Sequence, residues 1–282
     1  SGLFLLHPDV VVKPLGLRDF ALQPVVGVYS PTYRQARALA DQLLERGAQP
    51  LEADINPADR YLMERFIASG ATLSGALTRR RDHACMRDPV LRPAAVRPQL
   101  TMASFDIETA MDSLQLYSIA VHVTYTGALC PDPQAKPAAL SRVFMVGDQP
   151  VGDGVEIVSS QRAVLECFLD FIAKVDPDVL VGWNVVNFDT WYLQRVADSL
   201  GVPLRLGRAA TTVHWRTLDE DGERRAARLP GRLLLDGIEL LRAAFYRFES
   251  FALDAVAREL LGAGKLLHGA GRGEEIGRLF RE

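Results

Sequence analysis

The first part of the chain alternates short apolar runs with segments of helical periodicity. Residues 24–30 are rich in β-branched residues and begin at a proline, which is typical of a strand. Apolar positions recur at helical spacing over residues 33–48, and an Asn-Pro start signal predicts a second helix over 57–70. A short strand is expected at 51–55. This order of strands and helices predicts a small α/β unit.

The next segment, residues 77–98, combines many arginines and prolines without a regular apolar period. We expect an exposed connector here, with the boundary between the predicted domains 1–97 and 98–282 at its end. The arginine run at 79–81 could contact phosphates, although a charge run on a connector is more often simply solvated.

From residue 100 onward, strongly apolar runs alternate with amphipathic segments. Strands followed by helices predict an α/β layered domain. The expected strands are 100–109, 114–126, 141–147, 178–184 and the first part of 231–245. The expected helices are 161–175, 188–201, the second part of 231–245, and 250–262. An Asp-Gly turn predicts a hairpin over 212–229, and we expect a surface loop at 131–138.

Composition and charge narrow the functional classes only slightly. The chain has 282 residues, of which 48% are hydrophobic and 24% charged, with a formal net charge of −3. This charge does not favour a strongly basic nucleic-acid binder, although a local groove can still be positive. Three separated cysteines without a C-x-x-C pair indicate free thiols in a reducing compartment. The apolar start is short and broken by Pro8, so we expect no signal peptide, no membrane span and a cytoplasmic protein.

Two acidic residues, Asp106 and Glu108, lie near the end of the predicted strand 100–109. Because side chains alternate along a strand, the two acids share one face and Ile107 lies on the other. Neighbouring carboxylates repel one another, and a cation offsets this cost. Such oxygen ligands suit Mg²⁺ or Mn²⁺. The alternative is a strand end with two solvated acids, and the short motif alone does not exclude it.

A second polar group follows the predicted buried strand 178–184, where the chain turns into a helix that begins near Phe188 and Asp189. Asp189 could cap this helix. It also follows a strand, at the edge where α/β sheets present functional groups. Asn184 offers an amide to a substrate, and Phe188 offers a ring that could stack on a base. Both interpretations of Asp189 stay open.

Together, these two groups resemble the first two exonuclease motifs of the family B DNA polymerases. Asp-x-Glu on one strand is followed about 80 residues later by Asn-x-x-x-Phe-Asp at a strand-to-helix turn. Three further stretches of this chain resemble the bacterial polymerase II branch of that family: RYLMERFI, DPDVLVGWNVVNFD and GRLLLDGIELLRAAFYRFESFALDAVARELLGAGK. The resemblance extends from about Leu15 to the end of the chain, and its motifs agree in order and context.

The resemblance implies a DEDD-type 3′→5′ exonuclease domain with a ribonuclease-H-like fold, in which helices flank a mixed β-sheet, preceded by a smaller α/β domain. Asp106, Glu108 and Asp189 would hold two divalent ions, Mg²⁺ or Mn²⁺, that activate a water and stabilise the leaving 3′ oxygen. Three residues would contact the single-stranded 3′ end of the DNA: Thr109, Asn184 and Phe188.

The same resemblance implies a parent enzyme that synthesises DNA on a primer–template in replication and repair. We expect a monomer associated with the nucleoid, with no membrane partner. A contact with the sliding clamp, through regions outside this chain, stays an open possibility.

The third exonuclease motif of the family, Tyr-x-x-x-Asp on a helix, is absent, since no Tyr of this chain has an Asp four residues later. In the family this motif lies beyond the segment where the chain stops. We therefore expect a truncated piece of a longer polymerase, with weak nuclease activity or none. His214 and Asp219 have the histidine–aspartate spacing of a related exonuclease class, but they precede a hairpin turn where that class needs a helix.

Asp236 ends a predicted strand and precedes a helix, so it either supports the acidic site or caps the helix, and capping is favoured. Two other functions stay open. The missing third motif would suit a non-enzymatic nucleic-acid-binding remnant, and a ribonuclease-H-like nuclease could act on RNA instead of DNA.

Overall fold

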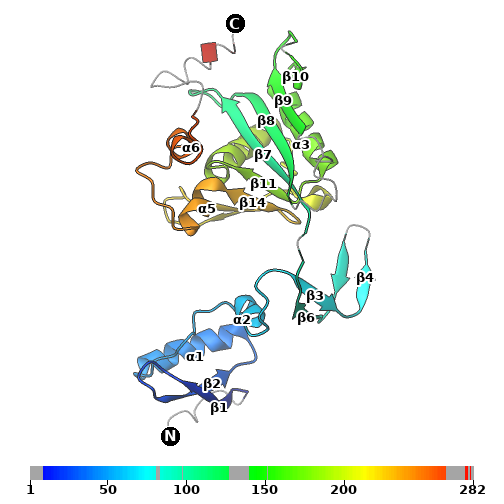
Figure 1. The fold of residues 1–282 in the computed structure, drawn as a ribbon. Coiled ribbons are helices and arrows are strands. Elements are labelled where there is room, and N and C mark those ends of the chain that lie inside the picture. Colours follow the sequence, from blue (N-terminus) through cyan, green and yellow to red (C-terminus); the bar gives the residue numbers. More distant parts are fainter. Residues whose placement is uncertain are drawn as a thin grey trace. The chain divides into compact units, whose positions relative to one another are not determined.

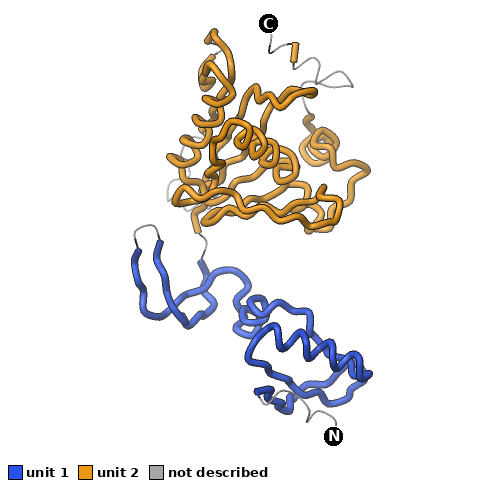
Figure 2. Tube along the Cα trace, turned by 180° about the vertical axis from the view of Figure 1, so that it is seen from behind, with its two compact units in different colours: residues 1–97 blue, residues 98–282 orange. Residues whose placement is uncertain are grey.

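The computed structural model describes residues 9–80, 83–96, 98–126, 140–150, 152–264, 277, 278 and 280. The chain divides into two compact units, residues 1–97 and 98–282 (Figure 2). The loop predicted at 131–138 lies outside the described residues. None of the helices within the described ranges is both long enough and apolar enough to span a membrane.

In the part of the first unit that the structure describes, there are two short helices and three antiparallel strand pairs. Its pairs and helices are β1 (Val11–Arg18) with β2 (Pro24–Tyr29), β3 (Ala71–Ser74) with β6 (Val90–Pro93), β4 (Leu77–Arg79) with β5 (Ala84–Met86), α1 (Tyr33–Glu45) and α2 (Pro57–Met63).

Local signals place the helices of this unit well at their starts and less well at their ends. The Asn56 side chain accepts the Ala58 N–H at 2.9 Å and so caps α2, as the Asn-Pro signal predicts. However, α2 ends at Met63 and not at residue 70, because the chain turns into the left-handed region at Phe66, where φ is 54°. The predicted strand at 51–55 is also wrong. Glu52 has a φ of 52°, which lies outside the β region, and its carboxylate pairs with Arg60 at 2.8 Å.

The segment predicted as a connector, 77–98, is folded for most of its length. It contributes β4 and β5, which pair as a local hairpin, and β6, which pairs with β3. The segment is largely exposed, as predicted, but the interpretation as a mere connector was wrong because it missed these strands. Pairing between close neighbours along the chain compensates for the poor apolar pattern of each short strand.

The second unit is built on a six-stranded mixed sheet in the order β10-β9-β8-β7-β11-β14 (Figure 1). β8 runs antiparallel to both of its neighbours, whereas β10 is parallel to β9, and β7, β11 and β14 are parallel to one another. The strands are β7 (Leu100–Thr109), β8 (Leu116–Thr126), β9 (Leu140–Val146), β10 (Val155–Val158), β11 (Val179–Gly182) and β14 (Leu233–Asp236). This confirms the predicted mixed sheet, to which the structure adds β10.

Helices cover the sheet, and α3 packs against β8 and β9 (Figure 1). On β7, Phe105 and Ile107 are buried on the face toward α3, where the Phe105 ring lies 5.4 Å from that of Phe168. The remaining elements are α3 (Gln161–Val175), α4 (Trp191–Leu200), α5 (Gly237–Ala243), α6 (Leu253–Leu261) and the predicted hairpin of β12 (His214–Thr217) and β13 (Arg225–Arg228). His214 thus lies on a strand, which excludes the helical histidine–aspartate motif.

Candidate active site

Three strands bring the predicted acidic residues to one edge of the sheet. β7, β11 and β14 are parallel and adjacent, so their carboxyl ends lie at the same edge. Asp106 and Glu108 lie among the last four residues of β7, Asp236 ends β14, and the turn that carries Asp189 follows β11. Strand order therefore brings residues 106, 189 and 236 to the same edge of the sheet, although they are far apart in sequence.

On β7, the acids point away from the core, as the alternation of the strand predicts. Phe105 and Ile107 are almost completely buried, whereas Asp106 is exposed and Glu108 is half-buried. The apolar side chains anchor the strand against α3, and the acidic face is left open to solvent or a ligand.

Asp189 lies in a single π-helical turn, η2 (Val186–Thr190), between β11 and α4. Only 1% of its surface is exposed, and its Oδ1 accepts the backbone N–H of Ile107 at 3.2 Å. No side chain caps either η2 or α4. The capping interpretation of Asp189 is therefore wrong, because its carboxylate faces β7 instead of the start of the helix.

The Asp189 and Asp106 carboxyl groups are close enough to share a hydrogen bond. Burial and the negative charge of Asp106 raise the pKa of Asp189 to about 7. Within the described residues, neither carboxylate has an ion pair with a Lys, Arg or His side chain. The pair is therefore electrostatically costly in the absence of a cation or a proton.

Glu108 lies on the same face of β7, two residues after Asp106. Across the described ranges, no three His, Cys, Asp or Glu side chains are grouped closely enough to hold a metal ion. The structure thus brings together two of the three predicted acidic ligands, Asp106 and Asp189, and leaves Glu108 outside that close pair.

Asp236 supports the site from β14. Its Oδ1 accepts the Ile238 N–H at 3.0 Å, which is the predicted cap of α5. The same carboxylate also accepts the N–H groups of Asn184 at 3.2 Å and Val186 at 3.3 Å. It thereby fixes the backbone that enters η2, including Asn184, which has a left-handed φ of 56°. Asp236 therefore caps α5 and also stabilises the backbone that enters η2.

A cavity of about 590 Å³ opens beside the end of β7. It is lined by the loop 110–114 together with Thr109, Phe188, Tyr192 and Arg195. Phe188 is 47% exposed, so its ring is available to a ligand. Two of the predicted DNA contacts, Thr109 and Phe188, thus share one cavity, whereas Asn184 is not part of its lining.

Tyr192 and Arg195 were missed at the level of sequence. The Tyr192 hydroxyl lies 3.1 Å from the backbone carbonyls of Ser113 and Gln115, so it ties the cavity loop to α4. Arg195 is exposed and has no ion pair among the described residues. The spacing of Phe188, Tyr192 and Arg195, four and then three residues apart, could have indicated one helix face.

Comparison with known proteins finds two families along the chain. Residues 50–256 match "DNA polymerase family B, exonuclease domain", and residues 3–48 match "DNA polymerase II, insertion domain". The first match covers most of the chain, including the acidic pair and the cavity. These matches confirm the predicted family resemblance and the ribonuclease-H-like fold.

Individual relatives agree with the family matches. The chain is 38% identical to DNA polymerase II of Escherichia coli (strain K12), over 96% of this chain and 33% of that protein. It is 31% identical to the DNA polymerase delta catalytic subunit of Schizosaccharomyces pombe, over 55% of this chain and 17% of that protein. The chain therefore spans only about a third, or less, of these relatives.

A solved structure is also similar. The family B DNA polymerase from Pyrobaculum calidifontis aligns with 97% of this chain and 34% of its own, with a TM-score of 0.60 and 22% identity. At this identity, the likeness shows a shared fold.

Proposed function

Because this chain belongs to the family B DNA polymerases, we propose that its second unit hydrolyses the 3′-terminal nucleotide of DNA at Asp106, Glu108 and Asp189. The observation that carries the proposal is the contact between the Asp106 and Asp189 carboxyl groups, one of which is almost fully buried. A fold maintains such a pair at a cost in stability, and active sites are where this cost is usually found.

The acidic pair fits divalent cations. Carboxylate oxygens are the ligands that Mg²⁺ and Mn²⁺ prefer, and two like charges that no described cation offsets would gain from binding them. Asp106, Asp189 and Glu108 would hold two ions. When bound, these ions would activate a water and stabilise the charge that develops on the leaving 3′ oxygen.

The remaining residues would bind and orient the strand. The exposed Phe188 ring offers a stacking surface for a base, and Arg195 offers a cation for a phosphate in the same cavity. Thr109 lines this cavity, and Asn184 would contact the nucleotide from the turn before η2. Because a mispaired 3′ end frays readily, it would reach this cavity as a single strand.

The full-length protein, in this proposal, is a DNA polymerase that extends primers during replication and repair and uses this domain for proofreading. Its main partner is then primer–template DNA. The matches of both units to polymerase families support this view, as does the identity to a bacterial polymerase II over nearly the whole chain.

The test is the double substitution Asp106→Ala and Glu108→Ala in the full-length protein. Degradation of a single-stranded DNA 3′ end should fall at least about a thousandfold, because metal-bound charge stabilisation supplies several kcal/mol of the rate enhancement. Extension of a matched primer should continue at its original rate. Both activities can be followed on labelled oligonucleotides.

A matched control is Asp170→Ala, which removes an exposed acid from α3. This variant should degrade DNA as fast as the unchanged protein. Unaltered nuclease rates in the double variant would refute the assignment. A marked preference for RNA over DNA 3′ ends of the same sequence would point instead to a ribonuclease.

A further inference from the structure

The hairpin of β12 and β13 is joined to the π-helical turn that carries Asp189. The backbone N–H of Arg225 on β13 donates to Oδ1 of Asn187 at 2.9 Å, across 38 residues of sequence. Asn187 belongs to η2 and lies two residues before Asp189. This bond therefore connects a separate two-stranded sheet to the catalytic turn itself.

Further contacts join the same hairpin to α4, the helix that follows the turn. The Trp215 indole N–H donates to Gln194 Oε1 at 3.0 Å, and the Trp215 and Trp191 rings meet edge to face at 5.0 Å. The Arg225 guanidinium lies 4.3 Å from the centroid of the Trp191 ring. These contacts fix the hairpin on the helix, but they do not reach η2.

The turn needs outside support because its own hydrogen bonding is irregular. The Thr190 N–H donates to the Val185 carbonyl, five residues back, at 2.8 Å, which is the wide ring of a π-turn. Asp236 holds the backbone where the turn begins, and the Ile107 N–H meets the carboxylate near its end. The bond of Asn187 to β13 supplies the support between these two points.

We propose that Asn187 is a positioning residue for Asp189. By accepting the Arg225 N–H, it holds η2 in the register that aims the Asp189 carboxylate at the Ile107 amide and at Asp106. The consequence for catalysis rests on the proposed nuclease function, whereas the geometric role does not.

The Ile107 amide reports directly on this geometry, because its hydrogen-bond partner is Asp189. Hydrogen exchange of the metal-free chain, followed by NMR, should show that Asn187→Ala speeds exchange of this amide by about tenfold, the effect of losing roughly one hydrogen bond. Exchange of the Ala103 amide, in the middle of the paired part of β7, should not change. Asn187→Asp keeps an acceptor oxygen and should restore slow exchange at Ile107.

Gln194→Ala is the matched control, since it removes the other side-chain amide that accepts a hydrogen bond from the hairpin. It should leave Ile107 exchange unchanged. The proposal is overturned if Asn187→Ala leaves Ile107 exchange unchanged, or if Gln194→Ala accelerates it equally. Because no metal is present in this experiment, its outcome is independent of whether the acidic pair binds metal, which Mn²⁺ titration of the unchanged chain tests separately.

Discussion

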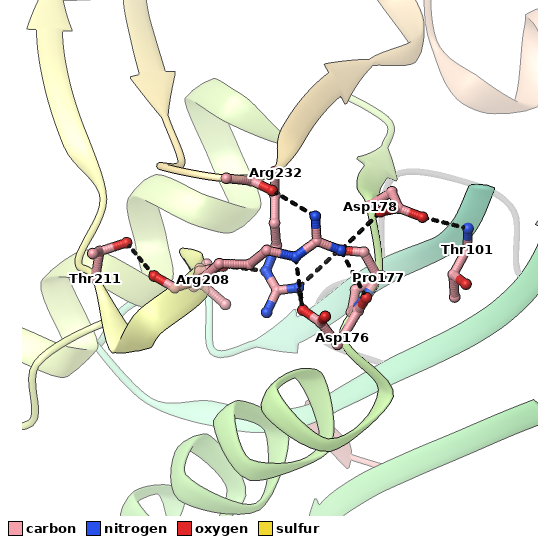
Figure 3. A network of polar contacts seen from close by, with 9 residues as sticks. Thr101, Asp176, Pro177, Asp178, Arg208, Thr211 and Arg232 are labelled. Atoms are coloured by element: carbon pink, nitrogen blue, oxygen red, sulfur yellow. Dashed lines mark hydrogen bonds and ion pairs between the residues drawn. The ribbon is translucent and has the colours of Figure 1, made fainter. Parts of the chain in front are cut away.

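Acidic residues at the two ends of the parallel strands β7, β11 and β14 have opposite electrostatic surroundings; we call these ends the amino edge and the carboxyl edge of the sheet. At the amino edge of β7, β11 and β14, Asp176 lies 2.9 Å from both Arg208 Nε and Arg232 Nη1, and Asp178 lies 2.7 Å from Arg208 Nη2 (Figure 3). At the carboxyl edge, Asp106 and Asp189 face each other, and no described Lys, Arg or His pairs with either. One edge carries its own cations, and the other leaves room for a ligand.

The pKa directions express the same difference. The hydrogen bond from Arg208 lowers the pKa of Asp178, and a bond from the Thr101 N–H adds to this effect. Burial beside Asp106 raises the pKa of Asp189 to about 7. The paired Asp178 at the amino edge therefore stabilises the fold at neutral pH, whereas the buried Asp189 carboxylate beside Asp106 destabilises it.

The largest effect is expected from Arg232, the most buried cation of the amino edge, whose side chain is 3% exposed. It donates to Asp176 and to the Pro177 carbonyl at 2.7 Å (Figure 3), and also to the Leu206 carbonyl at 2.9 Å. Arg232→Ala should lower the free energy of unfolding by about 3–5 kcal/mol, because it removes a buried guanidinium and leaves the buried carbonyls of Pro177 and Leu206 without this donor. Urea unfolding of the chain measures this change.

The control for this prediction is Glu166→Ala, which breaks the exposed pair between Glu166 and Arg162 on α3. Such a pair contributes less than about 0.5 kcal/mol. Equal losses in the two variants would show that the amino-edge network is no more important than an exposed ion pair.

The second effect has the opposite sign. Asp189→Asn should raise the free energy of unfolding of the metal-free chain by about 2–4 kcal/mol at pH 8, because the amide keeps the Ile107 bond and removes the cost of ionisation. A raised pKa stabilises the fold below the ordinary Asp value of 3.8 and loses that contribution as the pH rises toward about 7. The gain should therefore disappear near pH 4.

Urea unfolding at pH 4 and pH 8, with a chelator present, tests this window. Stabilisation of the same size at both pH values would mean that the substitution acts by packing and not by charge. A loss of stability at pH 8 would show that the Asp189 carboxylate is already compensated.

The approach of Asp106 to Asp189 was predictable from sequence because Asp106 lies near the end of one strand and Asp189 follows another. The alternation of β7 placed Asp106 and Glu108 on one face, and the strand before Asp189 located it at the sheet edge. The π-helical turn that carries Asp189 and the hydrogen bond of Asp189 to Ile107 were not predictable, because both depend on tertiary contacts that no local sequence pattern encodes. Tyr192 and Arg195 were missed for the same reason, since the loop that makes them cavity residues folds onto α4 only in three dimensions.

The amino-edge network left no sequence signal at all. Asp176 and Asp178 precede β11, and their sequence context is that of ordinary loop residues. Arg208 and Arg232 come from two separate segments later in the chain. In the first unit, the errors at 51–55 and 77–98 arose where few residues are buried, so that local propensity alone does not decide the structure. Prediction therefore succeeded where burial imposes a period, and failed where few residues are buried or where contacts are distant.

A third effect should come from adding a divalent cation. At pH 8, Mg²⁺ at ten times its dissociation constant should raise the free energy of unfolding by about 1.4 kcal/mol. Asp189→Asn should remove most of this increase. Chemical unfolding with MgCl₂, compared with NaCl at equal ionic strength, separates binding from screening. An undiminished Mg²⁺ effect in the variant would place the ion elsewhere.

The smallest effect returns to the amino edge and sharpens the comparison most. Asp178→Asn removes a charged acceptor from Arg208 while keeping an oxygen for the Thr101 N–H, and should cost about 1 kcal/mol at pH 7, since the pair is partly exposed. A lowered pKa contributes stability above the ordinary value of 3.8 and loses it as the pH falls below that value. The variant should therefore match the unchanged chain in strong acid, a pH dependence opposite in sign to that of Asp189→Asn. If Asp178→Asn and Asp189→Asn changed the free energy of unfolding in the same direction at pH 7–8, the two edges would not differ in charge compensation. The pair of Asp106 and Asp189 would then no longer support a metal site.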